Sequence, residues 1–219
     1  MIGIYGGTFD PVHYGHLRTA LEVKEALDLV EVRFVPARLP PHRAPPVASA
    51  EARRRMLEAA LMDAPPGFRL DERELMRPGP SYMVDTLRSL RQELGQIPLC
   101  LLIGMDAFLG LPTWYQWPAI FELAHVVVMT RPGYALQWPA GLAEQLLGRQ
   151  SVEKEDLPRN PAGAIYFQPV IQLDISSTFI RQCLATGRDP RYLLPDSVLA
   201  LIRREGYYQT TQSIKRQVP

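Results

Sequence analysis

The sequence predicts an α/β fold, a doubly wound parallel sheet with a small helical segment at its C-terminal end. Two observations lead to this prediction: short apolar runs alternate with longer stretches of helical period, and glycine- or proline-rich loops separate them. Alternating strands and helices form βαβ units with right-handed crossovers, which give a parallel sheet covered on both faces. Ligands bind beyond the carboxyl ends of such strands, so we expect the chemistry in the loops that follow them.

The first half of the chain contains most of the predicted elements. Leu17, Leu21 and Leu27 recur at helical spacing in the first long stretch, and the next run is rich in β-branched residues that favour a strand. The predicted strands of this half lie at residues 2–5, 30–35, 68–70 and 99–103. The predicted helices between them lie at residues 15–29, 50–62 and 81–94.

The second half is predicted to complete the sheet and then to close with helices. Apolar, β-branched runs predict strands at residues 124–130 and 165–170. Residues 138–161 are less regular and are interpreted as a helix and a mobile loop. Helical periodicity predicts two closing helices at residues 178–185 and 195–205.

The composition is that of a globular domain, with 47% hydrophobic and 21% charged residues among 219. We expect a single domain over residues 1–219, with a core at 1–175 and a helical part at 176–219. The 24 Lys and Arg residues nearly balance the 23 Asp and Glu residues, which leaves a formal charge of +1. No global basic field exists to bind nucleic acid, so any phosphate recognition is expected to be local.

The cysteines and the hydropathy pattern limit the cellular setting. Cys100 and Cys183 lie far apart in apolar stretches, which argues against a disulfide framework or a CxxC metal site. The N-terminal residues lack the basic and apolar regions of a signal peptide, so a cytoplasmic location is expected. The apolar runs at 97–105 and 126–129 are shorter than the roughly 20 residues that a membrane span needs. No membrane role is expected.

The loop after the first predicted strand is the first candidate site. Its glycine pair, Gly6 and Gly7, allows close approach of a ligand and positive φ angles. His13 and His16 follow at the entry of a helix, where free N–H groups and the helix dipole favour an anion. Two histidines at this spacing also occur on helix surfaces, as packed pairs or as metal ligands. Their place after a glycine pair at the end of a strand favours phosphate binding.

A second candidate site lies near the other end of the chain. Ser176, Ser177 and Thr178 precede an apolar helical run and are typical of a helix N-cap. Capping does not account for Arg181, which lies four residues after Ser177 on the same helix face. Its guanidinium can reach phosphates bound at the start of that helix. The residues alone leave capping and phosphate binding open.

Both segments resemble motifs of the nucleotidyltransferase superfamily that carries a His-x-Gly-His motif. The first segment, GGTFDPVHYGHL, is similar to its amino-terminal signature, and residues 176–181 resemble its Ser-x-Thr-x-x-Arg motif. The resemblance implies a Rossmann-like core in which His16 and Arg181 hold ATP phosphates while His13 works beside them. It further implies ATP contacts at Gly6, Gly7, Thr8, Phe9, Gly104, Asp106, Ser177 and Thr178.

Four central segments and residues 192–198 resemble one branch of that superfamily, the bacterial nicotinate mononucleotide adenylyltransferases. The central segments are PPHR at 40–43, SYMVDTL at 81–87, IGMD at 103–106 and LPTWYQW at 111–117. The resemblance covers essentially the whole chain. It implies that nicotinate mononucleotide and ATP react to give deamido-NAD and pyrophosphate.

The same resemblance implies the acceptor-binding residues. Trp114 is expected to stack on the pyridine ring, and backbone N–H groups at helix starts near Met83 and Tyr115 to receive the nicotinate carboxylate. Met83 departs from the family, where threonine is frequent. The remaining expected contacts with the acceptor are His42, Arg43, Tyr82 and Thr86. Without the resemblance, the aromatic residues at 114–117 are equally consistent with a packed cluster, Asp106 with a helix cap and the 42–43 pair with solvated charges.

Three other functions remain open at this point. The same chemistry can act on nicotinamide mononucleotide or phosphopantetheine, a nucleotide sensor can retain the fold without catalysis, and a tRNA synthetase core uses a related motif. Intact His13, His16 and Arg181 argue against the sensor, and the balanced charge argues against the synthetase. The expected partners are therefore ATP and nicotinate mononucleotide, with Mg²⁺ bound through the ATP phosphates and not through protein side chains. The chain is expected to be a monomer or a homodimer.

Overall fold

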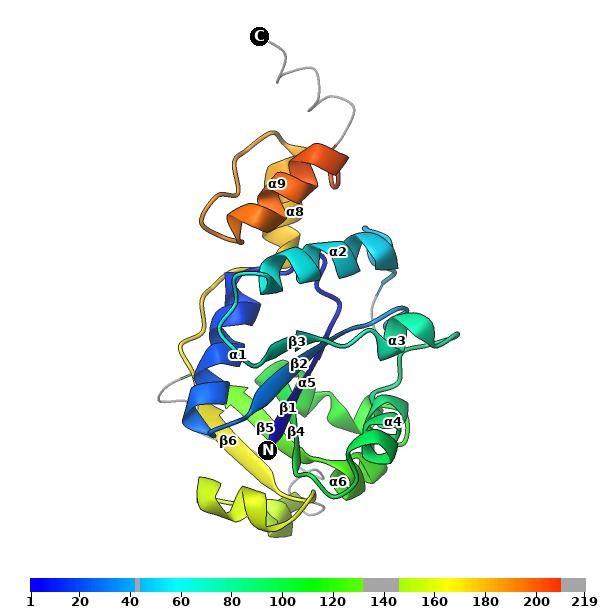
Figure 1. Cartoon of the computed structure of the whole chain (residues 1–219), viewed down its shortest axis with the longest axis vertical. Helices are drawn as coiled ribbons and strands as arrows, with labels where there is room; N and C mark the ends of the chain where they lie inside the picture. Colours follow the sequence, from blue (N-terminus) through cyan, green and yellow to red (C-terminus); the bar gives the residue numbers. More distant parts are fainter. Residues whose placement is uncertain (42–43, 132–145, 210–219) are drawn as a thin grey trace.

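A six-stranded parallel sheet forms the centre of the computed structural model, which describes residues 1–41, 44–131 and 146–209 (Figure 1). The strand order is β3-β2-β1-β4-β5-β6, so the order reverses between β1 and β4. This arrangement confirms the predicted doubly wound sheet. The strands are β1 (Ile2–Gly7), β2 (Glu31–Pro36), β3 (Phe68–Leu70), β4 (Leu99–Gly104), β5 (His125–Thr130) and β6 (Ile165–Pro169).

The two central strands diverge toward their carboxyl ends. Pairing between β1 and β4 joins Ile2–Ile4 with Leu99–Leu101, whereas β1 continues to pair with β2 as far as Gly7 and Pro36. The last residues of β1 and β4 therefore border the reversal point of the sheet. This is the place where open α/β sheets bind their ligands.

Helices cover both faces of the sheet, because its strands carry apolar side chains on both sides. One core lies beneath α1, α2, α8 and α9, and a second core lies beneath α4, α5 and α6 on the opposite face. The helices are α1 (Tyr14–Ala26), α2 (Ala50–Leu61), α3 (Arg73–Met76), α4 (Met83–Leu94), α5 (Met105–Leu109), α6 (Ile120–Leu123), α8 (Ser177–Ala185) and α9 (Asp196–Glu205).

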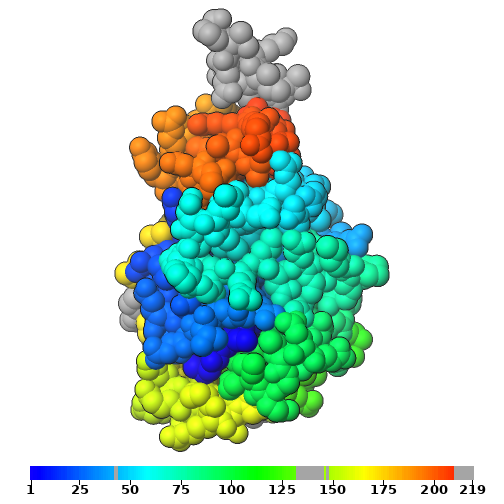
Figure 2. Space-filling view, viewed as in Figure 1, coloured from blue at the N-terminus to red at the C-terminus, as the bar shows by residue number. Residues whose placement is uncertain are grey.

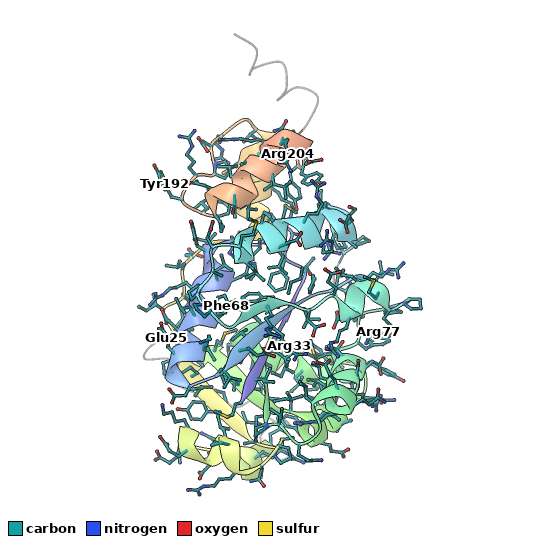
Figure 3. The ribbon with its side chains drawn as sticks, in the orientation of Figure 1. Glu25, Arg33, Phe68, Arg77, Tyr192 and Arg204 are labelled. Carbon is teal, nitrogen blue, oxygen red and sulfur yellow. The ribbon has the colours of Figure 1, made fainter. Side chains whose placement is uncertain are left out.

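Helix α9 packs on α2, and the segment that contains α8 and α9 continues the surface of the molecule beyond α2 (Figures 1 and 2). The Ser197 hydroxyl donates to the Ala59 carbonyl at 2.9 Å, and Arg55 pairs with Glu205 at 2.9 Å. Tyr192, in the loop between α8 and α9, is 85% exposed and points away from the protein (Figure 3). The C-terminal helices are thus joined to the rest of the protein through α2.

The predicted strands and long helices are confirmed to within a few residues. The largest shift is at α1, which ends at Ala26 because Asp28 turns the chain with a φ of 51°. The sequence reading missed the four- and five-residue helices α3, α5 and α6, which are too short to show periodicity. In the region predicted as a helix and mobile loop, the described part contains two 3₁₀ helices, Leu147–Arg149 and Lys154–Arg159. Residues 138–145 of that prediction lie outside the described residues. No helix among those described is long and apolar enough to cross a membrane.

Candidate active site

The loop that leaves β1 packs tightly at the reversal point of the sheet. A Cβ atom on Gly6 would lie 2.5 Å from the terminal methyl group of Met83, so the lack of a side chain at Gly6 lets α4 approach the strand. Neither Gly6 nor Gly7 has a positive φ, and this part of the prediction was wrong. Phe9 takes that conformation with a φ of 48°, and its ring is 2% exposed. Only the backbone of Phe9 is therefore available to a nucleotide.

The two histidines lie together at the start of α1. Their rings stack with centroids 3.7 Å apart, and the His13 backbone N–H donates to Nδ1 of His16 at 3.3 Å. Because Nδ1 of His16 accepts a hydrogen bond, the neutral ring carries its proton on Nε2. Burial lowers the pKa of His13 from 6.5 to about 4. His13 is therefore neutral at pH 7, and the half-buried His16 presents an N–H donor.

The far segment meets this loop directly. Ser176 caps α8 by accepting the Phe179 N–H at 3.2 Å, which confirms the capping interpretation for that serine. The Ser177 hydroxyl donates to the Pro11 carbonyl at 2.9 Å. Arg181 donates to the Asp10 carbonyl at 2.6 Å. The structure thus brings together the two motifs that the sequence places near opposite ends of the chain.

The exposed Thr178 side chain also contacts the guanidinium of Arg181. Its hydroxyl oxygen accepts from Nη2 of Arg181 at 3.2 Å. Two acceptors therefore orient the half-buried Arg181, one in the first loop and one on α8. This arrangement presents a cation at the N-terminal end of α8, as anion binding requires.

The end of β4 supplies the other side of the reversal point. Gly104 precedes α5 in an extended conformation, and a Cβ atom at this position would meet open space. Asp106 is exposed in the first turn of α5. The predicted Gly104 and Asp106 thus lie across the diverging strands from the loop after β1.

The N-terminus of α4 faces the same end of the sheet. Its N-cap residue is Tyr82, whose side chain makes no capping hydrogen bond, and Met83 is the first helical residue. The first N–H groups of a helix have no partner within that helix. The Tyr82 ring packs on the Tyr115 ring with centroids 4.5 Å apart. This helix start is therefore suited to receive a carboxylate beside aromatic rings.

The structure corrects one of the predicted acceptor contacts and locates two others. Thr86 is fully buried, and its hydroxyl donates to the Glu74 carboxylate at 2.6 Å, so its side chain faces the protein interior. Tyr115 lies between the 3₁₀ helices Leu111–Thr113 and Trp117–Ala119, and it directly precedes the N-cap of the second, so a short helix does start near it. Trp114 is half-buried and ends the first of these. His42 and Arg43 lie outside the described residues.

Sequence reasoning missed a buried arginine beneath the site. Arg53 of α2 is 1% exposed, and burial lowers the pKa of its guanidinium. The side chain donates to four backbone carbonyl groups of the loops after β1 and β2, those of Thr8, Ala37, Arg38 and Ala48. The missed signal is its spacing, since Arg53 shares a helix face with the buried Met56, Leu57 and Ala60.

A buried carboxylate, Glu74, was also missed. It is 3% exposed, and burial raises its pKa while hydrogen bonds from Thr86 and Ser81 oppose that rise. The Ser81 oxygen also accepts the Arg38 N–H at 2.9 Å, which links this carboxylate to the loop after β2. Arg77, which follows α3 at the edge of the molecule, donates to the Thr86 hydroxyl at 3.1 Å (Figure 3). These contacts support the turn before α4.

Comparison with known proteins identifies the family. The cytidylyltransferase-like family model matches residues 4–183. A probable nicotinate-nucleotide adenylyltransferase of Methylococcus capsulatus is 58% identical over 95% of this chain and 99% of that protein. One of Halorhodospira halophila is 52% identical over 94% of each chain. The chain belongs to the cytidylyltransferase-like family and, within it, to the nicotinate-nucleotide adenylyltransferases. The predicted family is thereby confirmed.

Solved structures show the same fold at low sequence identity. The nicotinic acid mononucleotide adenylyltransferase of Plasmodium falciparum, in complex with NaAD, has a TM-score of 0.72 at 16% identity. That match covers 94% of this chain and 96% of the other. A putative nicotinate-nucleotide adenylyltransferase of Vibrio parahaemolyticus has a TM-score of 0.63 at 16% identity and covers 94% of each chain. These likenesses agree with the parallel sheet and its helical layers.

Proposed function

We propose that this protein transfers the AMP unit of ATP to the phosphate of nicotinate mononucleotide, which gives deamido-NAD and pyrophosphate. One observation carries the proposal: Arg181 and Ser177 donate to Asp10 and Pro11, in the loop that leads from β1 to the two histidines at the reversal point of the sheet. The names of the relatives agree with this acceptor. The family and the geometry therefore support the same reaction.

The ATP half of the site is assigned to the first loop and the start of α8. The backbone of residues 6–9 would border the nucleotide, and the Nε2–H of His16 would donate to a phosphate oxygen. Arg181 would bind the outer phosphates together with Ser177 and Thr178, which lie in the first turn of α8. The ribose of the adenosine would lie near Gly104 and Asp106, at the end of β4.

The acceptor half is assigned to the start of α4 and the aromatic residues beside it. The N–H groups at Met83 would receive the nicotinate carboxylate, since a helix N-terminus favours an anion. Trp114 would stack on the pyridine ring, with Tyr82 and Tyr115 bordering it. A neutral carboxamide gains less from the helix dipole, so this arrangement favours the acid over the amide. His42 and Arg43 remain proposed contacts of the acceptor phosphate.

The chemistry requires positioning and charge neutralisation. An ionised phosphate oxygen of the acceptor attacks the α-phosphorus of ATP, a new P–O bond forms, and the bond to pyrophosphate breaks. No general base is needed, because the attacking oxygen carries no proton. His16 and Arg181 would stabilise the negative charge that develops on the α-phosphate and the leaving group.

Mg²⁺ is proposed to enter the site with ATP. Among the residues that the structure describes, no three His, Cys, Asp or Glu side chains gather where they could hold a metal ion. The donor set of the loop, histidines and an arginine, suits phosphate oxygens and not a hard cation. Bound to the phosphates, Mg²⁺ would supply further charge neutralisation.

Pyrophosphate release tests the proposal. ATP and Mg²⁺ are offered with nicotinate mononucleotide, nicotinamide mononucleotide or phosphopantetheine in separate reactions. The nicotinate substrate is expected to react fastest, and the Trp114→Ala variant is expected to raise KM for it without changing KM for ATP. Preference for another acceptor would remove the pocket assignment. ATP binding without pyrophosphate release in the presence of any of these acceptors would instead favour a nucleotide sensor.

A further inference from the structure

Tyr208 lies beyond the last helix, yet its side chain reaches the first loop of the chain. Gly206 and Tyr208 both have positive φ angles, 69° and 63°, which turn the chain back toward the sheet after α9. The Tyr208 hydroxyl donates to Oδ1 of Asp10 at 2.6 Å. Burial, followed by the hydrogen bond to Asp10, raises the pKa of this phenol, so it stays a protonated donor at neutral pH.

The carboxylate that receives this hydrogen bond is buried. Asp10 is 5% exposed, and its two oxygens also accept the backbone N–H groups of Val47 at 2.8 Å and Ala48 at 3.1 Å. Tyr208 thus provides the third donor to Asp10. A buried carboxylate that loses a donor gains a large desolvation cost, which favours a shift of its loop.

Asp10 in turn orients Arg181 through its main chain. Nη1 of Arg181 donates to the Asp10 carbonyl at 2.6 Å, and it lies 3.9 Å from the carboxylate oxygen Oδ2. The position of the guanidinium therefore depends on the position of the Asp10 peptide. Since Tyr208 holds the side chain of the same residue, a continuous set of contacts joins Tyr208 to Arg181.

We propose that Tyr208 is a positioning residue for ATP, because its hydroxyl fixes Asp10 and Asp10 places the phosphate-binding guanidinium of Arg181. This inference rests on the proposed function, which assigns Arg181 to the ATP phosphates. It predicts an effect on ATP that spares the nicotinate substrate. Among the described residues, the Tyr208 hydroxyl contacts Asp10 and the Met56 sulfur, and neither belongs to the start of α4, where that substrate is proposed to bind.

The first test removes only the hydroxyl. Tyr208→Phe is expected to lower kcat/KM for ATP by about tenfold, the loss typical of one hydrogen bond to a charged group. KM for nicotinate mononucleotide should stay unchanged, while the melting temperature should fall by a few degrees because the buried Asp10 carboxylate loses one donor. Tyr207→Phe is the matched control, because the neighbouring hydroxyl contacts Arg55 at 3.4 Å and should leave the kinetics unchanged.

A double-mutant cycle decides whether the effect passes through Arg181. In an Arg181→Lys background, which removes the bidentate guanidinium, Tyr208→Phe should cost less than twofold. An undiminished tenfold loss in that background would overturn the proposal, as would wild-type kinetics of Tyr208→Phe itself. If wild-type protein releases no pyrophosphate, the proposed function fails instead, so the two failures are distinguishable.

A second substitution keeps the proposal testable if Tyr208→Phe folds poorly. Replacing Tyr208 with 4-aminophenylalanine retains a donor at the same place on the ring, and circular dichroism checks that the protein is folded. Kinetics within threefold of wild type would support the donor role. A loss of kcat/KM for ATP as large as that of a folded Tyr208→Ala variant would overturn it, because a retained donor on the ring would then make no difference.

Discussion

The His13 backbone N–H donates to Nδ1 of His16 across 3.3 Å, at the N-terminus of α1. This bond fixes which nitrogen of His16 carries the proton, because the accepting Nδ1 must be unprotonated in the neutral ring. The stacked His13 ring, which burial keeps neutral at pH 7, limits rotation of its partner. The N–H donor of His16 is therefore oriented before ATP binds, as electrostatic stabilisation of a transition state requires.

Loss of that donor is the first prediction. His16→Ala is expected to lower kcat by about 10²–10³, the range for removal of one preorganised donor. His16→Gln places an amide N–H near the position of Nε2 and should retain more activity than His16→Asn, whose amide mimics Nδ1. Pyrophosphate release measures the rates, and circular dichroism verifies folding. Near-normal turnover of the alanine variant would exclude the mechanism.

Arg53 gives a prediction about stability. Arg53→Met keeps the length of the side chain but leaves four backbone carbonyl groups without their donor, so it is expected to cost about 3 kcal/mol of the free energy of unfolding. Urea denaturation measures the change.

The neighbouring arginine on the same helix is a matched control for Arg53. Arg54 makes surface ion pairs with Glu51, Glu58 and Glu72, and such pairs contribute little. Arg54→Met is therefore expected to cost less than about 1 kcal/mol. Equal losses in the two variants would show that the buried hydrogen bonds of Arg53 add nothing to stability.

Arg53 also illustrates what the sequence predicts and what it does not. The strands and long helices could be predicted, because periodicity reports burial over many residues. The apolar face of α2 is visible in the sequence, but the acceptors of an arginine on that face come from two distant loops. Such tertiary hydrogen bonds have no local sequence signal. The short helices α3, α5 and α6 could not be predicted for a related reason: tertiary packing stabilises them, and they are too short to show periodicity.

The candidate site divides in the same way. Both motifs could be found in the sequence. The sheet topology then brings Arg181 into contact with the first loop, at the carboxyl ends of the strands. Thr86 shows the limit of inference from a resemblance. The resemblance identifies the position, but only the structure shows that its hydroxyl faces Glu74. Positive φ at the glycine pair was inferred from residue type alone, and the strand conformation of Gly6 and Gly7 overrides it.

Glu74 gives a prediction about the acceptor. Because it accepts hydrogen bonds from Thr86 and Ser81 on both sides of the turn before α4, Glu74→Ala is expected to loosen that turn. KM for nicotinate mononucleotide should rise about tenfold, the effect of one lost charged hydrogen bond, while KM for ATP stays unchanged. Steady-state kinetics with each substrate varied in turn measures the split.

Two further variants control the Glu74 experiment. Glu74→Gln keeps an oxygen acceptor and should fall between wild type and the alanine variant. Glu72→Ala removes a nearby carboxylate whose contact is with Arg54 and should leave both KM values unchanged. Equal rises in both KM values for Glu74→Ala would point to general loss of structure and contradict a role in holding α4.

The last prediction concerns acid. Burial lowers the pKa of His13 to about 4, so between pH 6.5 and pH 4 the unfolded chain binds a proton that the folded protein does not. The contribution of the neutral ring is fully present above pH 6.5 and is lost as the pH falls. For these two pKa values, linkage gives a loss of about 2 kcal/mol between pH 7.5 and pH 5. Urea unfolding at the two pH values measures it.

Replacement of His13 separates its contribution to the pH dependence of stability from that of the other buried histidine, His125. His125 adds a loss of the same sign, because it is 1% exposed, accepts the Ala164 N–H at Nδ1 and contacts the Asn160 carbonyl through Nε2. Burial lowers its pKa, and protonation at Nδ1 would remove the acceptor. His13→Gln should therefore reduce the pH dependence by about 2 kcal/mol and leave the part due to His125. A pH dependence identical to that of wild type would mean that the His13 ring titrates alike in the folded and unfolded states, and its burial would then have no electrostatic consequence.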